Sequence, residues 1–323
     1  MVCTEKHYYE ILDKNARNFI GTIFSPEDFK NRRSPALALG MPVSTACNLK
    51  CKFCYTDTHN NKNSELTLEQ RLNLLCQAKE IGIKTVMTAA SGEALCDPDF
   101  FPILEHSKKL GFNYFLFSNL TKITKDIAEK LYTYNVGILG SCHSIRENVY
   151  EDLTQIKGSF KQMMLGAENL IEAGYSAQNF MISWVVNKKN YDEFEEMLHF
   201  WLQKGIKVFP EYGNITGAGN RYKDELYIPY DEYLKLRNEM NNKFQGYNVI
   251  PPLTYENKCF SGMYGIIVGI DGLITRCWDA GDEGYIGDIR EMSLKEAVEI
   301  KYKNPCFCPG YDNCIGRNLF LNK

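Results

Sequence analysis

Three cysteines stand close together near the start of the chain. Cys47, Cys51 and Cys54 have the spacing C-x3-C-x2-C and fall within eight residues. Three thiolates on one short loop can bind three corners of an iron–sulfur cube and leave the fourth iron without a protein ligand. Such an open position can bind a substrate or cofactor. A zinc site is the alternative, but it needs a fourth ligand, for which His59 is the only nearby candidate.

A second group of cysteines lies in the last sixty-five residues. Two of them flank the stretch MYGIIVGIDGLIT, which predicts two β-strands joined by a turn at Asp271 and Gly272. Three more follow in NPCFCPGYDNC. Together they predict a second metal site, and their spacing suits either zinc or an iron–sulfur cluster. The five thiols are Cys259, Cys277, Cys306, Cys308 and Cys314.

The composition is that of an ordinary globular protein. The 323 residues are 44% hydrophobic, enough for one large domain and a smaller one. Lys and Arg number 37 against 40 for Asp and Glu, so charge predicts neither a nucleic acid nor a membrane partner. The chain has no apolar run that predicts a signal peptide or a membrane span, and we expect a cytoplasmic location. There, twelve cysteines predict metal binding rather than disulfides.

The elements that must position these cysteines alternate between short apolar runs and amphipathic runs. This pattern predicts a parallel sheet covered by helices. Parallel strands place their chemistry at their carboxyl ends, so the first cysteine loop would follow the first strand. The strands are predicted at 36–44, 84–88, 113–117, 136–140, 179–186 and 207–210, and the helices after Ser64 and at 99–110, 126–134, 160–173 and 191–204.

Six strands are too few for a closed (β/α)8 barrel, so the prediction is an open, partial (β/α)6 barrel of the TIM type. We expect an N-terminal extension at 1–39, the barrel at 40–240 and a small cysteine-rich extension with a β-hairpin at 241–323. The stretch Gly213–Gly219 lacks the Lys-Ser/Thr pair of a phosphate-binding loop and is interpreted as a connection.

The first cysteine loop, with Phe53 before Cys54, resembles the signature of the radical S-adenosylmethionine (radical SAM) superfamily. The resemblance implies a 4Fe-4S cluster whose open iron binds S-adenosylmethionine. It also implies reductive cleavage to a 5′-deoxyadenosyl radical that takes a hydrogen atom from a substrate. An electron donor such as flavodoxin or ferredoxin is the implied partner.

The same resemblance implies further cofactor-binding residues. The loop Ser91-Gly92-Glu93-Ala94 follows the second strand and resembles the Gly-Gly-Glu-Pro loop that contacts the methionine amino group, although Ser91 and Ala94 depart from it. Cofactor-binding roles are thereby implied for the aromatic residue of the signature, for two residues of this loop and for three residues at the ends of the next two strands. These six are Phe53, Gly92, Glu93, Ser118, Asn119 and Ser141.

The second cysteine group resembles the SPASM and twitch extensions, in which Cys259, Gly272 and Cys277 match the opening C-x12-G-x4-C. That resemblance implies an auxiliary 4Fe-4S cluster. A full SPASM extension has two further cysteines downstream, whereas no cysteine follows Cys314 here. A single auxiliary cluster of the twitch type is therefore implied. Four of the five thiols would bind it.

Three side chains are candidates for the chemistry on the substrate. Cys142 follows a strand and could donate a hydrogen atom, or it could be a small core residue. Glu211, beside Tyr212, could transfer a proton or bind substrate, or it could be a solvated carboxylate. Asp279 could lie near the auxiliary cluster. His143 is expected to be structural or solvent-facing.

The resemblance implies hydrogen abstraction from a small, sugar-like molecule or a peptide, with dehydrogenation, epimerisation or cross-linking as the outcome. Only about 40 residues precede the first cluster, fewer than a leader-recognition domain needs. This favours a small molecule or a peptide bound without such a domain. The alternatives are a maturase of ribosomal peptides and a zinc-stabilised binding protein without redox chemistry.

Overall fold

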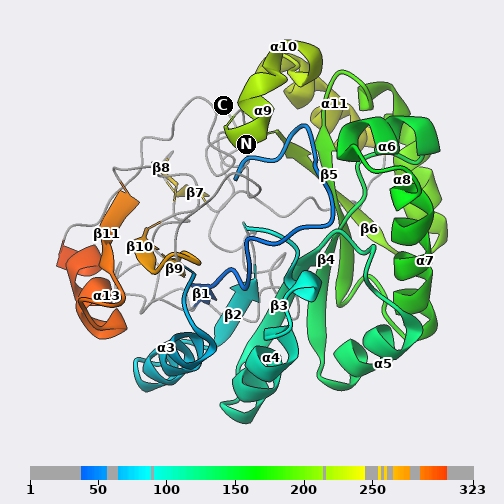
Figure 1. The fold of residues 1–323 in the computed structure, drawn as a ribbon. Helices are drawn as coiled ribbons and strands as arrows, with labels where there is room; N and C mark the ends of the chain where they lie inside the picture. Colours follow the sequence, from blue (N-terminus) through cyan, green and yellow to red (C-terminus); the bar gives the residue numbers. More distant parts are fainter. Residues whose placement is uncertain are drawn as a thin grey trace. The chain divides into compact units, whose positions relative to one another are not determined.

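The computed structural model describes residues 38–56, 65–88, 91–213, 216–243, 254–255, 258–259, 265–276 and 284–303. The chain divides into two compact units that alternate along the sequence. The first unit comprises residues 1–46, 61–116 and 252–323, and the second comprises 47–60 and 117–251. Both units are built from β-strands and covering helices (Figure 1).

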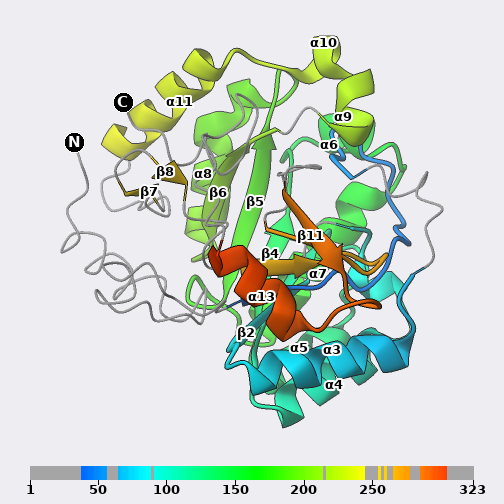
Figure 2. The ribbon, with the colours of Figure 1, turned by 90° about the vertical axis from the view of Figure 1, so that its left-hand side faces the viewer.

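The first unit contains a mixed sheet in which β1 lies between β2 and β9 and runs parallel to both. A β-hairpin turn joins β9 to the antiparallel β10, and β11 pairs antiparallel with β10. Helix α13 lies beside α3 (Figure 2), where the Leu294 N–H donates to the Gln77 side chain at 2.8 Å. The elements are β1 (Ala38–Gly40), α3 (Leu68–Glu80), β2 (Thr85–Thr88), η3 (Ala94–Cys96), α4 (Phe100–Lys109), β7 (Thr254–Tyr255), β8 (Lys258–Cys259), β9 (Gly265–Val268), β10 (Leu273–Thr275), β11 (Tyr285–Asp288) and α13 (Leu294–Lys303).

The strand β3 (Asn113–Ser118) pairs parallel with β2 and contains the point where the chain passes from the first unit to the second. The second unit holds three parallel strands in the order β4, β5, β6, with helices α5 to α8 covering them (Figure 1). Its elements are α5 (Lys125–Thr133), β4 (Val136–Ser141), α6 (Glu147–Thr154), α7 (Ser159–Glu172), β5 (Phe180–Val186), η4 (Tyr191–Glu193), α8 (Phe194–Gln203), β6 (Lys207–Tyr212), α9 (Gly217–Arg221), α10 (Lys223–Leu226) and α11 (Tyr230–Lys243).

Burial explains why these runs form strands. The first five residues of β4 are buried, as are six of the seven residues of β5, as expected for parallel strands covered on both faces. Helix α8 is amphipathic and buries Phe194, Met197, Leu198 and Trp201. Local signals set the helix starts, since Thr67 caps α3 in a capping box with Gln70.

The six strands that the alternation predicts are present as β1 to β6, and the hairpin at Asp271 and Gly272 is present as β9 and β10. The structure is therefore a mixed α/β fold with parallel strands. Helix α6 was not predicted, nor was the parallel pairing of β9 with β1. The predicted domain boundary near residue 240 stays a prediction.

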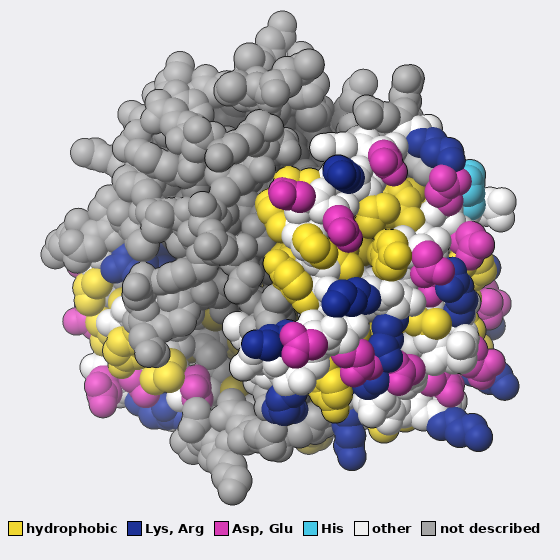
Figure 3. Space-filling model, turned by 90° about the horizontal axis from the view of Figure 1, so that it is seen from above, with side chains coloured by type: hydrophobic (Ala, Val, Ile, Leu, Met, Phe, Trp, Pro, Cys, Tyr) yellow, Lys and Arg dark blue, Asp and Glu magenta, His cyan; other side chains and the backbone are white. Residues whose placement is uncertain are grey.

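On the face seen in Figure 3, acidic and basic side chains of the described residues alternate, in keeping with the near balance of charge. Within the described part of the chain, no helix is long and apolar enough to cross a membrane.

Candidate functional site

The loop with Cys47, Cys51 and Cys54 belongs to the second unit, and helix α6 holds its backbone. The Lys50 N–H donates to the Thr154 carbonyl at 3.0 Å, and the Lys52 N–H donates to the Leu153 carbonyl at 2.9 Å. Both acceptors are in the last turn of α6, where helical carbonyls have no partner within the helix. The unpredicted helix therefore satisfies its own C-terminus by anchoring the cysteine loop.

The thiols of Cys47 and Cys54 lie close enough to Cys51 to influence its ionisation. Burial raises the pKa of the Cys51 thiol well above its usual value, and the charges of Cys54 and Cys47 raise it further. Each of the three residues is also partly exposed. Polar neighbours lie beside the outer two, with Thr56 Oγ1 at 3.4 Å from Cys54 Sγ and Asn119 Nδ2 at 4.0 Å from Cys47 Sγ.

These residues fit a 4Fe-4S cluster. The positive charge of an iron core would stabilise the thiolate form of Cys51 against its burial and against the charges of its two neighbours. His59, the candidate fourth ligand for zinc, lies outside the described residues.

Phe53, the aromatic residue of the signature, is held by a buried histidine. Its ring meets the ring of His143 edge-on, with the centroids 4.3 Å apart. His143 Nδ1 accepts the Val185 N–H at 3.1 Å, and the His143 carbonyl accepts the Asn190 side chain at 2.6 Å. Burial lowers the pKa of His143 to about 3, so the ring is neutral. His143 is thus structural, as the sequence suggested, and it is buried rather than solvent-facing.

The Gly92–Glu93 loop of the first unit packs on the backbone that leads into the cysteine loop. Gly92 has φ +65°, and a Cβ there would lie 2.3 Å from the Ser44 carbonyl oxygen and 2.6 Å from that of Ala46. Only glycine allows this approach. The Glu93 N–H donates to the same Ala46 carbonyl at 2.8 Å, and Ala46 is the residue before Cys47. The Glu93 side chain is buried and accepts the Leu95 N–H at 3.4 Å.

A buried arginine ties the two ends of this region of the first unit together. The Arg71 guanidinium donates to the Val43 carbonyl and forms ion pairs with Asp99 at 2.8 Å and Asp97 at 3.4 Å. Val43 leads into the cysteine loop, whereas the two aspartates follow Glu93 in the chain. Arg71 was not predicted, because the periodicity of α3 was read from its apolar residues alone. A charged residue between apolar helix positions was the available signal.

Asn119 binds the cysteine loop within the second unit. Its Nδ2 donates to Asn48 Oδ1 at 3.0 Å, and Asn48 in turn donates to Thr121 Oγ1 at 2.7 Å. Asn119 Oδ1 accepts the Thr121 N–H at 3.0 Å. Ser118 is buried and accepts the Leu120 N–H at 3.0 Å, which shapes the same turn. Asn48 was missed, although its place directly after Cys47 made it a candidate.

Two of the remaining candidates, Ser141 and Glu211, lie at or next to the carboxyl ends of β4 and β6. Ser141 ends β4 and is in register with Ser183 of β5, and Ser183 donates to Glu211 of β6 at 2.6 Å. Cys142 points into the core, where its thiol lies 3.4 Å from the Ser144 carbonyl oxygen and burial raises its pKa to about 12. This placement matches the packing alternative for Cys142, and its role as a hydrogen donor stays a prediction.

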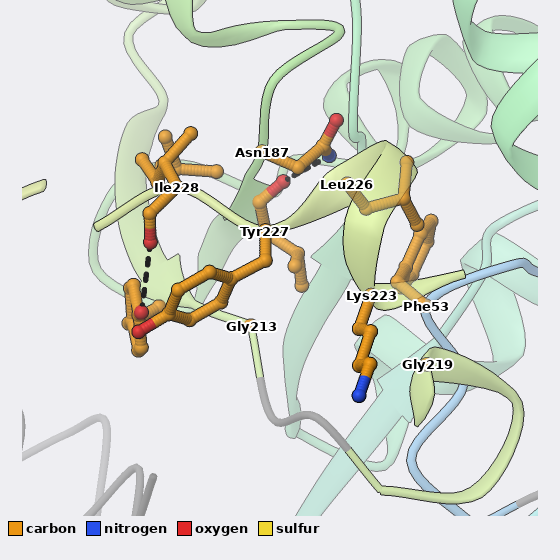
Figure 4. Close-up of a pocket in the computed structure, with 11 residues that line it drawn as sticks. Phe53, Asn187, Gly213, Gly219, Lys223, Leu226, Tyr227 and Ile228 are labelled. Carbon is orange, nitrogen blue, oxygen red and sulfur yellow. Dashed lines mark hydrogen bonds between the residues drawn. The ribbon is translucent and has the colours of Figure 1, made fainter. Parts of the chain in front are cut away.

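A pocket in the second unit opens beside Phe53. Its empty volume is about 350 Å³, part of which is open to solvent. Figure 4 shows Phe53 and Leu226 on one side of the pocket and Tyr227 and Ile228 on the other. Tyr212 closes it at the end of β6 and donates to the Ile228 carbonyl at 2.9 Å. The pocket is lined mainly by apolar and aromatic side chains.

Most of the predicted auxiliary site lies outside the described residues. Cys277, Cys306, Cys308, Cys314 and Asp279 all fall there. Of Cys259, only the backbone is described, in the strand β8, where it pairs with Thr254. Their roles stay predictions.

Comparison with known proteins gives a family match and several relatives. Residues 41–200 match the family model of the Radical SAM superfamily. An AdoMet-dependent heme synthase from Methanosarcina barkeri is 25% identical over 204 residues, which cover 62% of this chain and 57% of the synthase. The sporulation killing factor maturation protein SkfB from Bacillus subtilis is 24% identical over 246 residues, covering 73% of this chain and 59% of SkfB. The chain thus spans less than three fifths of the length of these two relatives.

A similar fold occurs in a solved structure. The crystal structure of Streptococcus suis SuiB bound to precursor peptide SuiA has a TM-score of 0.69 and 16% sequence identity, covering 91% of this chain and 73% of SuiB. This likeness shows that the fold is shared.

The buried neutral His143 predicts a pH-dependent loss of stability. The unfolded state takes up a proton near pH 6.5, whereas the folded state excludes it down to about pH 3. Stability contributed by the neutral ring is therefore complete above pH 6.5 and falls by about 1 kcal/mol per pH unit below it. In His143→Asn, the amide oxygen can still accept the Val185 N–H without this proton linkage. Urea unfolding at pH 7 and pH 5.5 should show a smaller loss for this variant than for the wild type.

The exposed His199 provides the control, because His199→Asn should keep the wild-type dependence on pH. Equal losses for His143→Asn and the wild type would contradict the prediction.

Proposed function

We propose, from the premise that residues 41–200 form a radical SAM domain, that this chain cleaves S-adenosylmethionine reductively and abstracts a hydrogen atom from its substrate. The observation that carries the proposal is that the thiols of Cys47 and Cys54 lie close enough to Cys51 to raise its pKa, on a loop with the spacing C-x3-C-x2-C. When bound to them, a 4Fe-4S cluster supplies the electron that breaks the sulfonium bond.

The remaining residues have proposed tasks that follow from their chemistry. The Glu93 carboxylate is an acceptor for the methionine ammonium group, and Gly92 permits close approach of the backbone. Phe53, at the edge of an apolar pocket, is likewise a proposed cofactor-binding residue. Ser118, Asn119 and Ser141 stay proposed as cofactor-binding residues. Glu211, bonded to Ser183, is a proposed site for proton transfer or substrate binding.

The proposed architecture has three parts: an N-terminal extension at 1–39, a partial (β/α)6 barrel at 40–240 and a twitch-like extension at 241–323. The succession of β1 to β6 and the β9–β10 hairpin support it. A cytoplasmic location and an electron donor such as flavodoxin or ferredoxin belong to the same proposal.

Cys51→Ala should abolish the release of 5′-deoxyadenosine from S-adenosylmethionine, because two thiols do not retain the cluster. The measurement is chromatography of the products after anaerobic incubation with dithionite. Cys76→Ala is the matched control, since Cys76 lies on α3 beside His106 and has no proposed role in cluster binding. Full activity of Cys51→Ala would refute the assignment of the loop.

We also propose an auxiliary 4Fe-4S cluster bound by Cys259, Cys277 and two of Cys306, Cys308 and Cys314. Its support is the cysteine spacing together with the β9–β10 hairpin that leads to Cys277.

With both clusters bound, the protein purified without oxygen should contain about eight iron and eight sulfide ions per chain. The double replacement of Cys259 and Cys277 by Ala should remove about half of each, because a cluster with too few thiolates is lost. Metal analysis that finds stoichiometric zinc, or unchanged iron in the double variant, would remove the auxiliary cluster.

For the substrate, we propose a peptide. SkfB carries a maturation role in its name, and SuiB was crystallised with a precursor peptide, and the two align with 73% and 91% of this chain. A small, sugar-like molecule is the second class, and dehydrogenation, epimerisation and cross-linking are the outcomes to be distinguished.

A peptide substrate should change mass when it is produced together with this chain. Short peptides encoded beside the gene are the probes, each co-expressed anaerobically with the wild type and, as the control, with Cys51→Ala. Mass spectrometry should find hydrogen loss, or deuterium uptake from D2O for an epimerisation, only with the wild type. If none changes while 5′-deoxyadenosine is still released, the peptide class is wrong.

A further inference from the structure

The segment 216–226 forms hydrogen bonds directly with the cysteine loop. Its first residues belong to the stretch Gly213–Gly219, which was predicted to be only a connection. The Cys54 carbonyl accepts the N–H of Ala218 at 2.8 Å and that of Gly219 at 3.3 Å. The Tyr55 carbonyl accepts the Thr216 hydroxyl at 3.0 Å. The carbonyls of both Cys54 and Tyr55 thereby have hydrogen-bond donors, and all these residues belong to the second unit.

Gly217 makes this approach possible. Its φ is +53°, and a Cβ there would lie 2.5 Å from the Tyr55 carbonyl oxygen and 2.8 Å from that of Cys54. Neither atom can move without moving the backbone of the cysteine loop. A methyl group at Gly217 would therefore displace the backbone that carries the Cys54 thiol.

A buried charge joins the same two segments. Lys52, directly after Cys51, forms ion pairs with Glu225 at 2.7 Å and with Asp152 at 2.8 Å. Its ammonium group also lies 5.6 Å from the ring centroid of Tyr222. Lys52 is only 8% exposed, so these partners compensate the cost of its burial. The segment thus contacts the cysteine loop at Lys52 as well as at Cys54.

The same segment also lines the pocket beside Phe53, through Gly219, Lys223 and Leu226 (Figure 4). One short piece of chain therefore contacts the cluster-binding loop and lines the pocket beside Phe53. A shift of this segment would change both together.

We propose that the segment 216–226 positions Cys54 for cluster binding and that Gly217 is its positioning residue. This inference rests on the proposed function. Its consequence is that a single methyl group at Gly217 alters the cluster at this loop far more than it alters the fold.

The experiment compares Gly217→Ala with Gly205→Ala in the anaerobically purified protein. Gly205 has φ +71°, so alanine is strained there too, but nothing lies within 4 Å of its Cβ position. The readouts are the thermal unfolding midpoint and the change that S-adenosylmethionine produces in the EPR spectrum of the reduced cluster. Gly217→Ala should need roughly tenfold more S-adenosylmethionine for this change, or lose the signal, because residues that orient ligands tune a metal site by such factors. Gly205→Ala should titrate as the wild type does.

Equal titrations for both variants would overturn the inference. A wild type without any S-adenosylmethionine-dependent change would instead refute the proposed function. If Gly217→Ala does not fold, Thr216→Val removes the hydroxyl bond to Tyr55 without adding bulk at the contact. A weaker response to S-adenosylmethionine then supports the inference, and a wild-type response overturns it.

Discussion

Three ligands on one short loop can bind the same cluster only if the loop keeps its shape, and hydrogen bonds from other parts of the chain hold its backbone. In the described residues of the second unit, three parts of the chain form hydrogen bonds with this loop. The end of α6 accepts the N–H groups of Lys50 and Lys52, and the segment around α9 donates to the carbonyl of Cys54. Asn119 binds the side chain of Asn48. Most of these bonds use backbone groups, and backbone bonds orient a loop without depending on flexible side chains.

Lys52 shows how a charge is accommodated beside this loop. Two lysines and two carboxylates form a network of four ion pairs, in which Lys52 and Lys189 each pair with both Asp152 and Glu225. Removal of one partner from a buried pair typically costs about 3–5 kcal/mol, because the other charge loses its compensation. The carboxylates here are partly exposed, so the cost is lower, but the buried Lys52 still depends on them. The pairing joins four separate segments of the second unit.

Two glycines allow the backbone contacts next to the cysteine loop. Gly92 approaches the carbonyls of Ser44 and Ala46 in the first unit, and Gly217 approaches those of Cys54 and Tyr55 in the second. Both have positive φ, and both face carbonyl oxygens at distances that exclude a Cβ. In each case a glycine was visible in the sequence, but the carbonyl that it must accommodate lies far away along the chain.

The sequence by itself determined the cysteine loop, the six parallel strands and the β9–β10 hairpin, because these follow from spacing and periodicity within short windows. It also indicated Gly92 and Glu93 through a family resemblance. The tertiary structure alone showed the contacts of Arg71, Asn48 and Gly217, and it decided that His143 and Cys142 are buried. Their partners are far from them along the chain, as Gly217 and Cys54 are, with 162 residues between them. Local periodicity carries no information about which distant carbonyl, ring or charge a side chain will meet, and packing of the folded chain supplies it.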